Sequence, residues 1–237
     1  LEIKNPERYA DRLMNAMQKE LRLDRQPRHI ECFDNSNLQG AHPVASCVVF
    51  RDGKPSRKEY RHFNIKTVEG PDDYASMREV VFRRYTRLMA EGAELPDLII
   101  ADGGKGQMGV IHEVLEHLGL DIPIAGLAKD DRHRTAELLC GFPPLLVGIR
   151  PTSPLFHFLS QIQEEVHRFA ITFHRQKRSK AFIRSELEQI EGIGDKTVQT
   201  LLRHFRTVEK VRAANIEELS ALVGPAKAKK IKAFFEK

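Results

Sequence analysis

What the sequence lacks narrows the class of protein first. No apolar run reaches the roughly 18 residues that a membrane-spanning helix needs, and the N-terminus has no secretory signal pattern. The 3 cysteines, Cys32, Cys47 and Cys140, lie far apart and form no CxxC pair, which argues against a structural zinc site. An odd number of cysteines in apolar settings predicts reduced core thiols, and therefore a cytoplasmic protein.

A phosphate-binding loop of the P-loop type is also missing. The glycine-rich stretch GGKGQ, residues 103–107, does not follow the spacing G-x-x-x-x-G-K-[ST]. Because that spacing is what lets backbone N–H groups surround a nucleotide's phosphates, NTP hydrolysis is not expected.

The net charge of +5 is unevenly distributed along the 237 residues. Residues 175–237 hold 15 Lys and Arg against 8 Asp and Glu, whereas residues 1–174 hold 23 against 25. A basic C-terminal segment beside a slightly acidic body is typical of a nucleic-acid-binding module attached to another domain. A solvated lysine-rich surface would give the same distribution, so charge alone leaves both interpretations open. The length favours two unequal domains.

Hydrophobic spacing predicts strands and helices over residues 1–178. The expected strands are His29–Asp34, Val44–Phe50, Glu59–Ile65, 96–104, 122–129 and two short ones near 137–140 and 145–148; the expected helices are 6–23, 70–92, 106–120 and 153–178. Asp52-Gly53 predicts a hairpin between the second and third strands. Three strands with short links, followed by strands alternating with helices, predict an α/β fold with a mixed sheet and helices on both faces.

The last part of the chain, residues 186–237, has no strand pattern and is expected to form a small all-α domain after a linker at 179–185. Its first half is a helix, a tight Gly-Ile-Gly turn at 192–194 and a second helix, and the plan repeats 30 residues later around Gly224. Such a glycine turn points the N–H groups of the next helix outward, which suits a DNA phosphate. The DNA-binding candidates are Gly192, Gly194, Lys196, Gly224, Lys227 and Lys229.

An ordinary helical corner would also end in glycine, but two basic copies in a row favour DNA binding. In the second copy, Pro225 removes one backbone donor. The first turn is therefore the better candidate for a phosphate clamp.

Two aspartates stand at the ends of predicted strands. Asp34 ends one strand and is followed by the turn formers Asn35, Ser36, Asn37 and Gly40; Asp102 ends another and precedes Gly-Gly. If the two strands are neighbours, the carboxylates lie side by side and need a cation between them, for which Mg²⁺ is suited. Paired carboxylates holding Mg²⁺ can hydrolyse phosphodiesters. Each aspartate taken singly also fits a turn or a helix cap.

Further candidates come from one late helix and from two loops. His167 and His174 are seven residues apart and share a helix face, where either could complete a metal site or move a proton, or both could simply lie at the surface. The pair Asp72-Asp73 fits a helix cap. The candidate phosphate-binding residues of this first region are Lys105, Arg175, Lys177 and Arg178.

Six blocks taken together resemble the C-terminal half of the UvrC family of bacterial excision-repair endonucleases. They are ECFDNSNLQG, VASCVVF, GPDDYASM, LIIADGGKGQ, HRFAITFHRQKR and IEGIGDKTVQTLL, in that order. The resemblance implies an RNase H-like endonuclease domain followed by a tandem helix-hairpin-helix domain. It also implies Asp34, Asp102 and His167 as ligands of Mg²⁺ or Mn²⁺, with Asp73 as a further aspartate of the catalytic site.

The resemblance implies incision of damaged double-stranded DNA on the 5′ side of a lesion, in the complex that UvrB forms on DNA after loading by UvrA. The family's N-terminal nuclease domain and UvrB-binding region are not found in this sequence, so a fragment of a longer protein is expected, monomeric and without a membrane partner. Two alternatives remain: a catalytically inactive DNA-binding scaffold, or another RNase H-like nuclease such as a junction resolvase or an RNase.

Overall fold

The computed structural model describes residues 5–36, 43–129 and 135–236. The chain divides into two compact units, Leu1–Ile171 and Thr172–Lys237. Within the described part, no helix combines the length and the apolar character that crossing a membrane requires.

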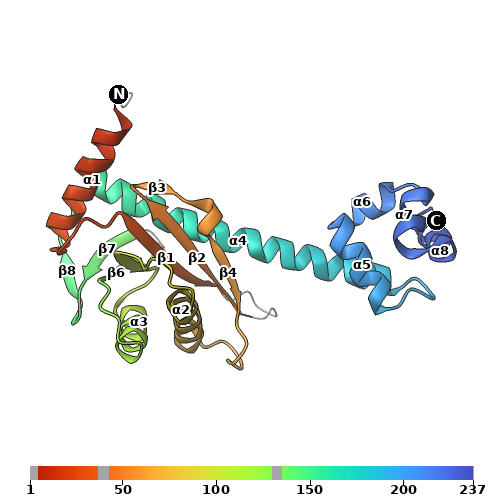
Figure 1. Cartoon of the computed structure of the whole chain (residues 1–237), viewed down its shortest axis with the longest axis horizontal. Coiled ribbons are helices and arrows are strands. Elements are labelled where there is room, and N and C mark those ends of the chain that lie inside the picture. Colours follow the sequence, from red (N-terminus) through yellow and green to blue (C-terminus); the bar gives the residue numbers. More distant parts are fainter. Residues whose placement is uncertain (1–4, 37–42, 130–134, 237) are drawn as a thin grey trace. The chain divides into compact units, whose positions relative to one another are not determined.

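The described residues of the first unit build an eight-stranded sheet (Figure 1). Its strands are β1 His29–Ser36, β2 Val44–Arg51, β3 Lys54–Pro55, β4 Arg61–Asn64, β5 Leu98–Ala101, β6 Ile124–Lys129, β7 Thr135–Cys140 and β8 Leu145–Val147. The order across the sheet is β3-β2-β1-β5-β6-β7-β8, with β4 also paired to β2. The β1–β5 and β5–β6 pairs are parallel and the remaining pairs antiparallel, so the predicted mixed sheet is confirmed.

Helices cover both faces of this sheet (Figure 1). α1, Pro6–Glu20, and the first part of α4, Pro154–Glu188, pack on one face; α2, Asp73–Ala90, and α3, Lys105–His117, pack on the other. Successive strand residues point to opposite faces. In β1, Ile30 and Cys32 accordingly join the core under α1 and α4, whereas Phe33 joins the core under α2 and α3.

Several predicted element ends shift in the structure. β1 runs on to Ser36, so Asn35 and Ser36 are strand residues rather than turn residues, while Asn37 and Gly40 lie outside the described residues. The predicted strand 59–65 begins with a 3-10 turn, Arg57–Glu59, and only Arg61–Asn64 is extended. The hairpin at Asp52-Gly53 is confirmed, since both residues have positive φ, as a type I′ turn requires.

The late helix is longer than the sequence pattern suggested. α4 continues to Glu188, so residues 179–185, expected to be a linker, are helical. No glycine or proline follows Pro154 before Glu188, so nothing in that stretch interrupts helical hydrogen bonding. The division between the compact units, at Ile171 and Thr172, also falls earlier than the expected boundary at residue 178.

A buried ionic cluster fixes β1 to α2. The Glu31 carboxylate is fully buried and accepts hydrogen bonds from the Arg84 guanidinium and, at 2.9 Å, from the Tyr85 hydroxyl. Burial alone would raise the pKa of Glu31, but interactions with His29, Arg84 and Tyr85 outweigh burial and lower it. The charged pair is therefore retained inside the protein because its hydrogen bonds replace those of water.

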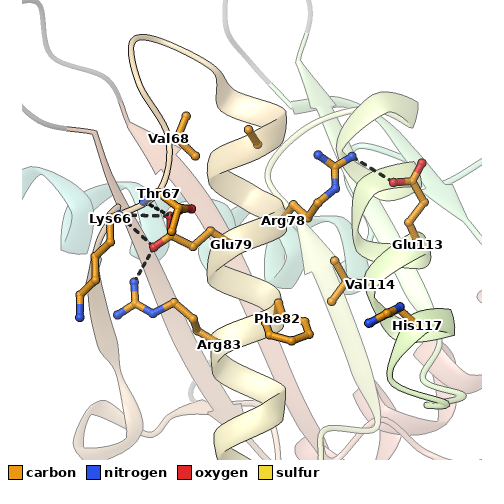
Figure 2. A pocket seen from close by; sticks show the side chains of 11 residues that line it. Lys66, Thr67, Val68, Arg78, Glu79, Phe82, Arg83, Glu113, Val114 and His117 are labelled. Atoms are coloured by element: carbon orange, nitrogen blue, oxygen red, sulfur yellow. Dashed lines mark hydrogen bonds and ion pairs between the residues drawn. The ribbon is translucent and has the colours of Figure 1, made fainter.

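The outer side of α2 and α3 carries a cavity of about 780 Å³, lined by residues of both helices and of the loop at 66–68 (Figure 2). Glu79 closes one side: its carboxylate accepts hydrogen bonds from the backbone N–H groups of Lys66 and Thr67 and from Arg83 (Figure 2). These bonds hold the loop after β4 against α2, on the face of the sheet away from α4.

The second unit is helical throughout its described part, as expected. α4 ends at Glu188, and α5 Asp195–Phe205, α6 Val208–Ala213, α7 Ile216–Val223 and α8 Pro225–Phe235 follow. Val198 and Ala228, each four residues after a turn glycine, are buried in one core with Leu187, Leu201 and Ile231. The repeated pattern of glycine and a packed residue four positions later therefore corresponds to two similar helical hairpins.

Breaking the buried ion pair should destabilise the first unit. Arg84→Met leaves the Glu31 carboxylate buried without its guanidinium partner, and we expect a loss of about 3–5 kcal/mol in the free energy of unfolding. Urea unfolding followed by tyrosine fluorescence measures this, because the chain has no tryptophan and its 4 tyrosines, Tyr9, Tyr60, Tyr74 and Tyr85, all belong to the first unit.

Arg87→Met is the matched control, since Arg87 pairs with Glu91 at the surface of the same helix. The Arg87→Met substitution should lower the free energy of unfolding by less than about 0.5 kcal/mol. Equal effects of the two substitutions would contradict the role of the buried pair.

Candidate metal and nucleic-acid site

Asp34 and Asp102 are brought together by the parallel pairing of β1 and β5. Phe33 lies opposite Ala101 in that pair, and the Asp102 N–H donates to the Phe33 carbonyl at 3.0 Å. Each aspartate is the next residue along its chain, so the two stand side by side. Because Phe33 and Ala101 belong to the core under α2 and α3, alternation directs both carboxylates to the opposite face, toward α4.

His167 joins them from α4. Its Nδ1 lies 3.4 Å from Asp34 Oδ2, and one ligand atom from each of Asp34, Asp102 and His167 lies within 4.8 Å of the other two. The Asp34 and Asp102 side chains are only 8% and 2% exposed, whereas that of His167 is 56% exposed. The geometry therefore gives a site with two buried carboxylates at its base and a solvent-accessible imidazole at its mouth.

These residues fit a divalent metal ion. Asp34 Oδ2 is buried and accepts no hydrogen bond, and His167 Nδ1, 3.4 Å away, compensates its charge only when the imidazole is protonated. Burial, followed by the neighbouring Asp102 charge, raises the pKa of Asp34 to about 7, although His167 and Lys129 act in the opposite direction. A cation between the two carboxylates would remove this repulsion, and carboxylate and imidazole groups are suitable ligands for Mg²⁺ or Mn²⁺.

Two polar residues of the site were not predicted from the sequence. Lys129, at the end of β6, places Nζ 3.0 Å from Asp102 Oδ2, and the Gln163 amide on α4 donates to Asp102 Oδ1 at 2.5 Å. A signal for each was present: Lys129 follows a buried strand next to that of Asp102, and Gln163 precedes His167 by one helical turn. Recognising them requires knowing that β6 lies beside β5.

Asp73 is outside the three-residue cluster formed among the described residues. It is exposed as the first residue of α2, and Asp72 is the N-cap, accepting from the Ala75 N–H at 2.9 Å. The backbone carbonyl of Asp73 accepts a hydrogen bond from the Asn35 side-chain amide at 2.7 Å, and this bond links the start of α2 to the residue after Asp34. Lys105, at the start of α3, is exposed three residues after Asp102.

The basic residues further along α4 differ in exposure. Arg175 and Arg178 are exposed, whereas His174 is buried, unlike His167. Lys177 is half-buried with Nζ 5.1 Å from the centre of the Phe173 ring, and burial lowers its pKa. Arg175 and Arg178 are thus the better placed of these side chains to meet a phosphate.

The first helical hairpin has the geometry expected of an anion site. Gly192 has φ +83°, and Gly194 precedes α5 without a side-chain cap for its first N–H groups. The positive φ of Gly192 favours glycine, and a Cβ there would also lie 2.5 Å from Lys230 Nζ, so the lysine side chain would have to move. Lys196 is exposed beside this turn. These features suit a phosphate at the start of α5.

The second hairpin is used differently. Gly224 has φ +87° and Pro225 begins α8, which removes one N–H from the turn, as the sequence predicted. Lys227 donates to the Thr197 hydroxyl at 2.9 Å, so this lysine bonds to the other hairpin, whereas Lys229 is exposed.

Residues 104–109, GKGQMG, also match the G-x-G-x-x-G pattern of dinucleotide-binding loops. Packing accounts for the second of these glycines, since a Cβ on Gly106 would lie 2.4 Å from the Tyr74 hydroxyl of α2. Nearby, a Cβ on Gly126 of β6 would meet Met108 of α3 at 2.6 Å. Close approach of α3 to its neighbours therefore accounts for glycine at Gly106 and Gly126.

Comparison with known families matches both parts of the chain. The model described as "UvrC RNAse H endonuclease domain" matches residues 18–171, and that of a "SAM-like Helix-hairpin-helix tandem" matches residues 184–237. The predicted RNase H-like fold and tandem hairpins are therefore confirmed. Among solved structures, Ciona intestinalis endonuclease V with a 24mer DNA matches at a TM-score of 0.35 and 14% identity, over 52% of this chain and 58% of that one. That similarity is too low to support an argument.

Curated relatives match over nearly the whole chain. UvrABC system protein C of Bacteroides fragilis is 61% identical over 228 residues, which cover 96% of this chain and 38% of that protein. The protein of the same name from Flavobacterium johnsoniae is 52% identical over 238 residues, covering 100% of this chain and 39% of that protein. The chain thus spans less than two fifths of the length of these relatives. Domain match, hairpin match and identity agree, and the chain belongs to the UvrC family.

Proposed function

We propose that this chain carries a metal-dependent DNA endonuclease of nucleotide excision repair. The observation that carries the proposal is the Asp34, Asp102 and His167 cluster, in which a buried carboxylate oxygen of Asp34 lacks a hydrogen-bond donor. Such a site, open at His167 and built from hard ligands, suits phosphodiester hydrolysis. Membership in the UvrC family supports DNA as the substrate.

The residues of the site would have different roles in hydrolysis. Asp34, Asp102 and His167 would hold Mg²⁺ or Mn²⁺, which when bound would lower the pKa of a water, so that hydroxide is available for attack, and would stabilise charge on the phosphate. Water then displaces the 3′ oxygen of the deoxyribose, which leaves 3′-hydroxyl and 5′-phosphate ends. With Nδ1 facing Asp34 and its ring half-exposed, His167 is placed either to ligate the ion or to exchange a proton with solvent. Asp73 has a supporting role at the start of α2.

The DNA is held by positive charge around this site and at the hairpins. Lys105 would bind a phosphate near the site, and Arg175 and Arg178, with the half-buried Lys177 contributing less, would bind phosphates further along the DNA. The hairpin turns, through Gly192, Gly194, Gly224, Lys196 and Lys229, would bind the duplex backbone without reading sequence. Because Lys227 bonds Thr197, its contribution is to hold the two hairpins together.

The finer assignment rests on the family rather than on geometry. In this proposal the cut falls on the 5′ side of a lesion in double-stranded DNA, within the complex that UvrB forms there after loading by UvrA. The setting is the bacterial cytoplasm. The identity of the relatives as UvrABC system protein C supports this assignment.

Removing either aspartate should abolish cleavage and preserve binding. For Asp34→Asn or Asp102→Asn we expect nicking of lesion-containing duplex in Mn²⁺ to fall by about 10³-fold or more, because the ion loses a charged ligand. A gel assay of cleavage beside a binding measurement tests this, with EDTA as the metal-free control. Glu113→Gln, on the exposed side of α3, is the matched control and should cleave normally. Normal nicking by Asp34→Asn would refute the site, and cleavage of branched DNA or RNA hybrids in preference to damaged duplex would refute the substrate.

Without metal, Asp34→Asn should stabilise the protein at neutral to alkaline pH. The folded pKa of Asp34 is raised to about 7, above the usual value near 3.9, so its ionisation destabilises the fold increasingly as pH rises through that interval. We expect the variant to gain on the order of 2 kcal/mol at pH 8 and almost nothing at pH 4, by urea unfolding with tyrosine fluorescence in EDTA. A gain that did not depend on pH would contradict this explanation.

Neutralising two hairpin lysines should weaken duplex binding and its salt dependence. Each phosphate contact contributes about 0.9 to the slope of log affinity against log salt, so Lys196→Met with Lys229→Met should lower that slope by nearly 2. Lys210→Met, an exposed lysine of α6 away from both turns, is the control and should leave the slope unchanged. If the slope of the double variant were unaltered, the phosphate contacts would have to be made by other residues.

A further inference from the structure

Three adjacent parallel strands bring polar side chains together at the same end of the sheet. β1 ends near Asp34, Asp102 follows β5, and β6 ends with Lys129. The β6–β7 pairing is irregular between Ala128 and Lys129. Such irregularities turn a side chain away from its regular direction, often beside functional sites. Here the Lys129 ammonium group is directed at Asp102.

Both oxygens of Asp102 are thereby occupied. Oδ1 accepts from the Gln163 amide at 2.5 Å, and Oδ2 accepts from Lys129 Nζ at 3.0 Å. A metal ion that uses Asp102 as a ligand must therefore share this carboxylate, which has about four lone-pair positions, with the two donors or displace one of them. Which donor, Gln163 or Lys129, leaves Asp102 first depends on how firmly the rest of the protein holds it.

Lys129 is the donor that is held less firmly. Gln163 is buried and its amide also lies 3.4 Å from the Leu127 carbonyl, so it has a second partner that fixes it. The Lys129 side chain is 31% exposed and reaches Asp102 through a flexible four-carbon stem. A divalent cation beside Asp102 would also repel the ammonium group, but not the neutral amide.

The displaced ammonium group has a suitable partner in the substrate. A DNA phosphate held at the metal carries a negative charge on its non-bridging oxygens, within reach of a side chain that already touches a metal ligand. Lysine binds phosphate as a mobile point charge, and three donors on Nζ suit a group whose position changes during binding.

We propose that Lys129 is a catalytic phosphate ligand that changes partner: it neutralises Asp102 in the metal-free protein, and on metal binding it moves to a phosphate oxygen of the bound DNA. This inference rests on the proposed nuclease function. It gives Lys129 two opposite effects. The residue competes with the metal for Asp102, and it assists cleavage once the metal is in place.

The test uses the whole chain with Lys129→Met, and Lys129→Gln as a second variant should the first fold poorly, each checked by tyrosine fluorescence. The first measurement is Mn²⁺ affinity without DNA, by titration calorimetry. We expect Mn²⁺ to bind about tenfold more tightly to the variant, because a positive competitor is gone. Lys66→Met, an equal change of charge at the cavity on the other face of the sheet (Figure 2), should leave that affinity unchanged.

The second measurement is single-turnover cleavage of lesion-containing duplex at saturating Mn²⁺. We expect Lys129→Met to cleave about 100-fold more slowly even with the metal site full, and Lys129→Arg, which keeps a phosphate-binding charge, to recover most of the rate. A residue that only stabilised the fold would not tighten Mn²⁺ binding while slowing cleavage.

The two parts of the proposal, competition with the metal for Asp102 and contact with a DNA phosphate, can be refuted separately. Unchanged or weaker Mn²⁺ binding in Lys129→Met would overturn the competition with metal, and tighter binding with an unchanged cleavage rate would overturn the phosphate contact. If the wild-type chain binds Mn²⁺ but does not nick DNA, the proposed function fails on that result. The difference in Mn²⁺ affinity between the wild-type chain and Lys129→Met still decides whether Lys129 competes with the metal for Asp102.

Discussion

The parallel pairing of β1 with β5 is the constraint on which the rest of the site depends. It sets Phe33 opposite Ala101 and so leaves the next residue of each strand, Asp34 and Asp102, adjacent on one face. A shift of one residue in either strand would turn its aspartate to the other face, away from α4. The two apolar cores and the Glu31–Arg84 pair fix that register, so residues far from the site determine whether the two carboxylates meet.

Bringing two carboxylates together has an electrostatic cost that the protein meets only in part. Lys129 and Gln163 satisfy Asp102, whereas Asp34 has a raised pKa and a buried oxygen that accepts no hydrogen bond. Carboxylates with raised pKa values are often found at functional sites, where a bound ligand supplies the missing interactions. A cation between the carboxylates would relieve this repulsion, so the unfavourable electrostatics of the metal-free site and the proposed metal binding have one cause.

The sequence allowed most of the order of strands and helices and the positions of the hairpin turns to be predicted, because these depend on local patterns, but not the short strand β3. It also indicated that Asp34 and Asp102 would be adjacent if their strands were neighbours, as they are. Asp34 was ambiguous by itself, since the residues after it favour turns, and it became informative only through its neighbour on β5. Lys129 and Gln163 could not be recognised, because their roles depend on β6 lying beside β5 and on the rotation of α4. The helical conformation of 179–185 was missed because the stretch SKAFIRS was taken for a flexible linker.

The bonds between the two helical hairpins have a consequence for how this module folds. Lys227 of the second hairpin bonds Thr197 of the first, Lys230 bonds the Glu191 carbonyl, and Gly192 leaves room for the Lys230 side chain. Neither hairpin therefore has a complete set of partners by itself. Because the two hairpins also share one hydrophobic core, loss of either copy would expose apolar side chains of the other, so the pair is expected to fold as one piece.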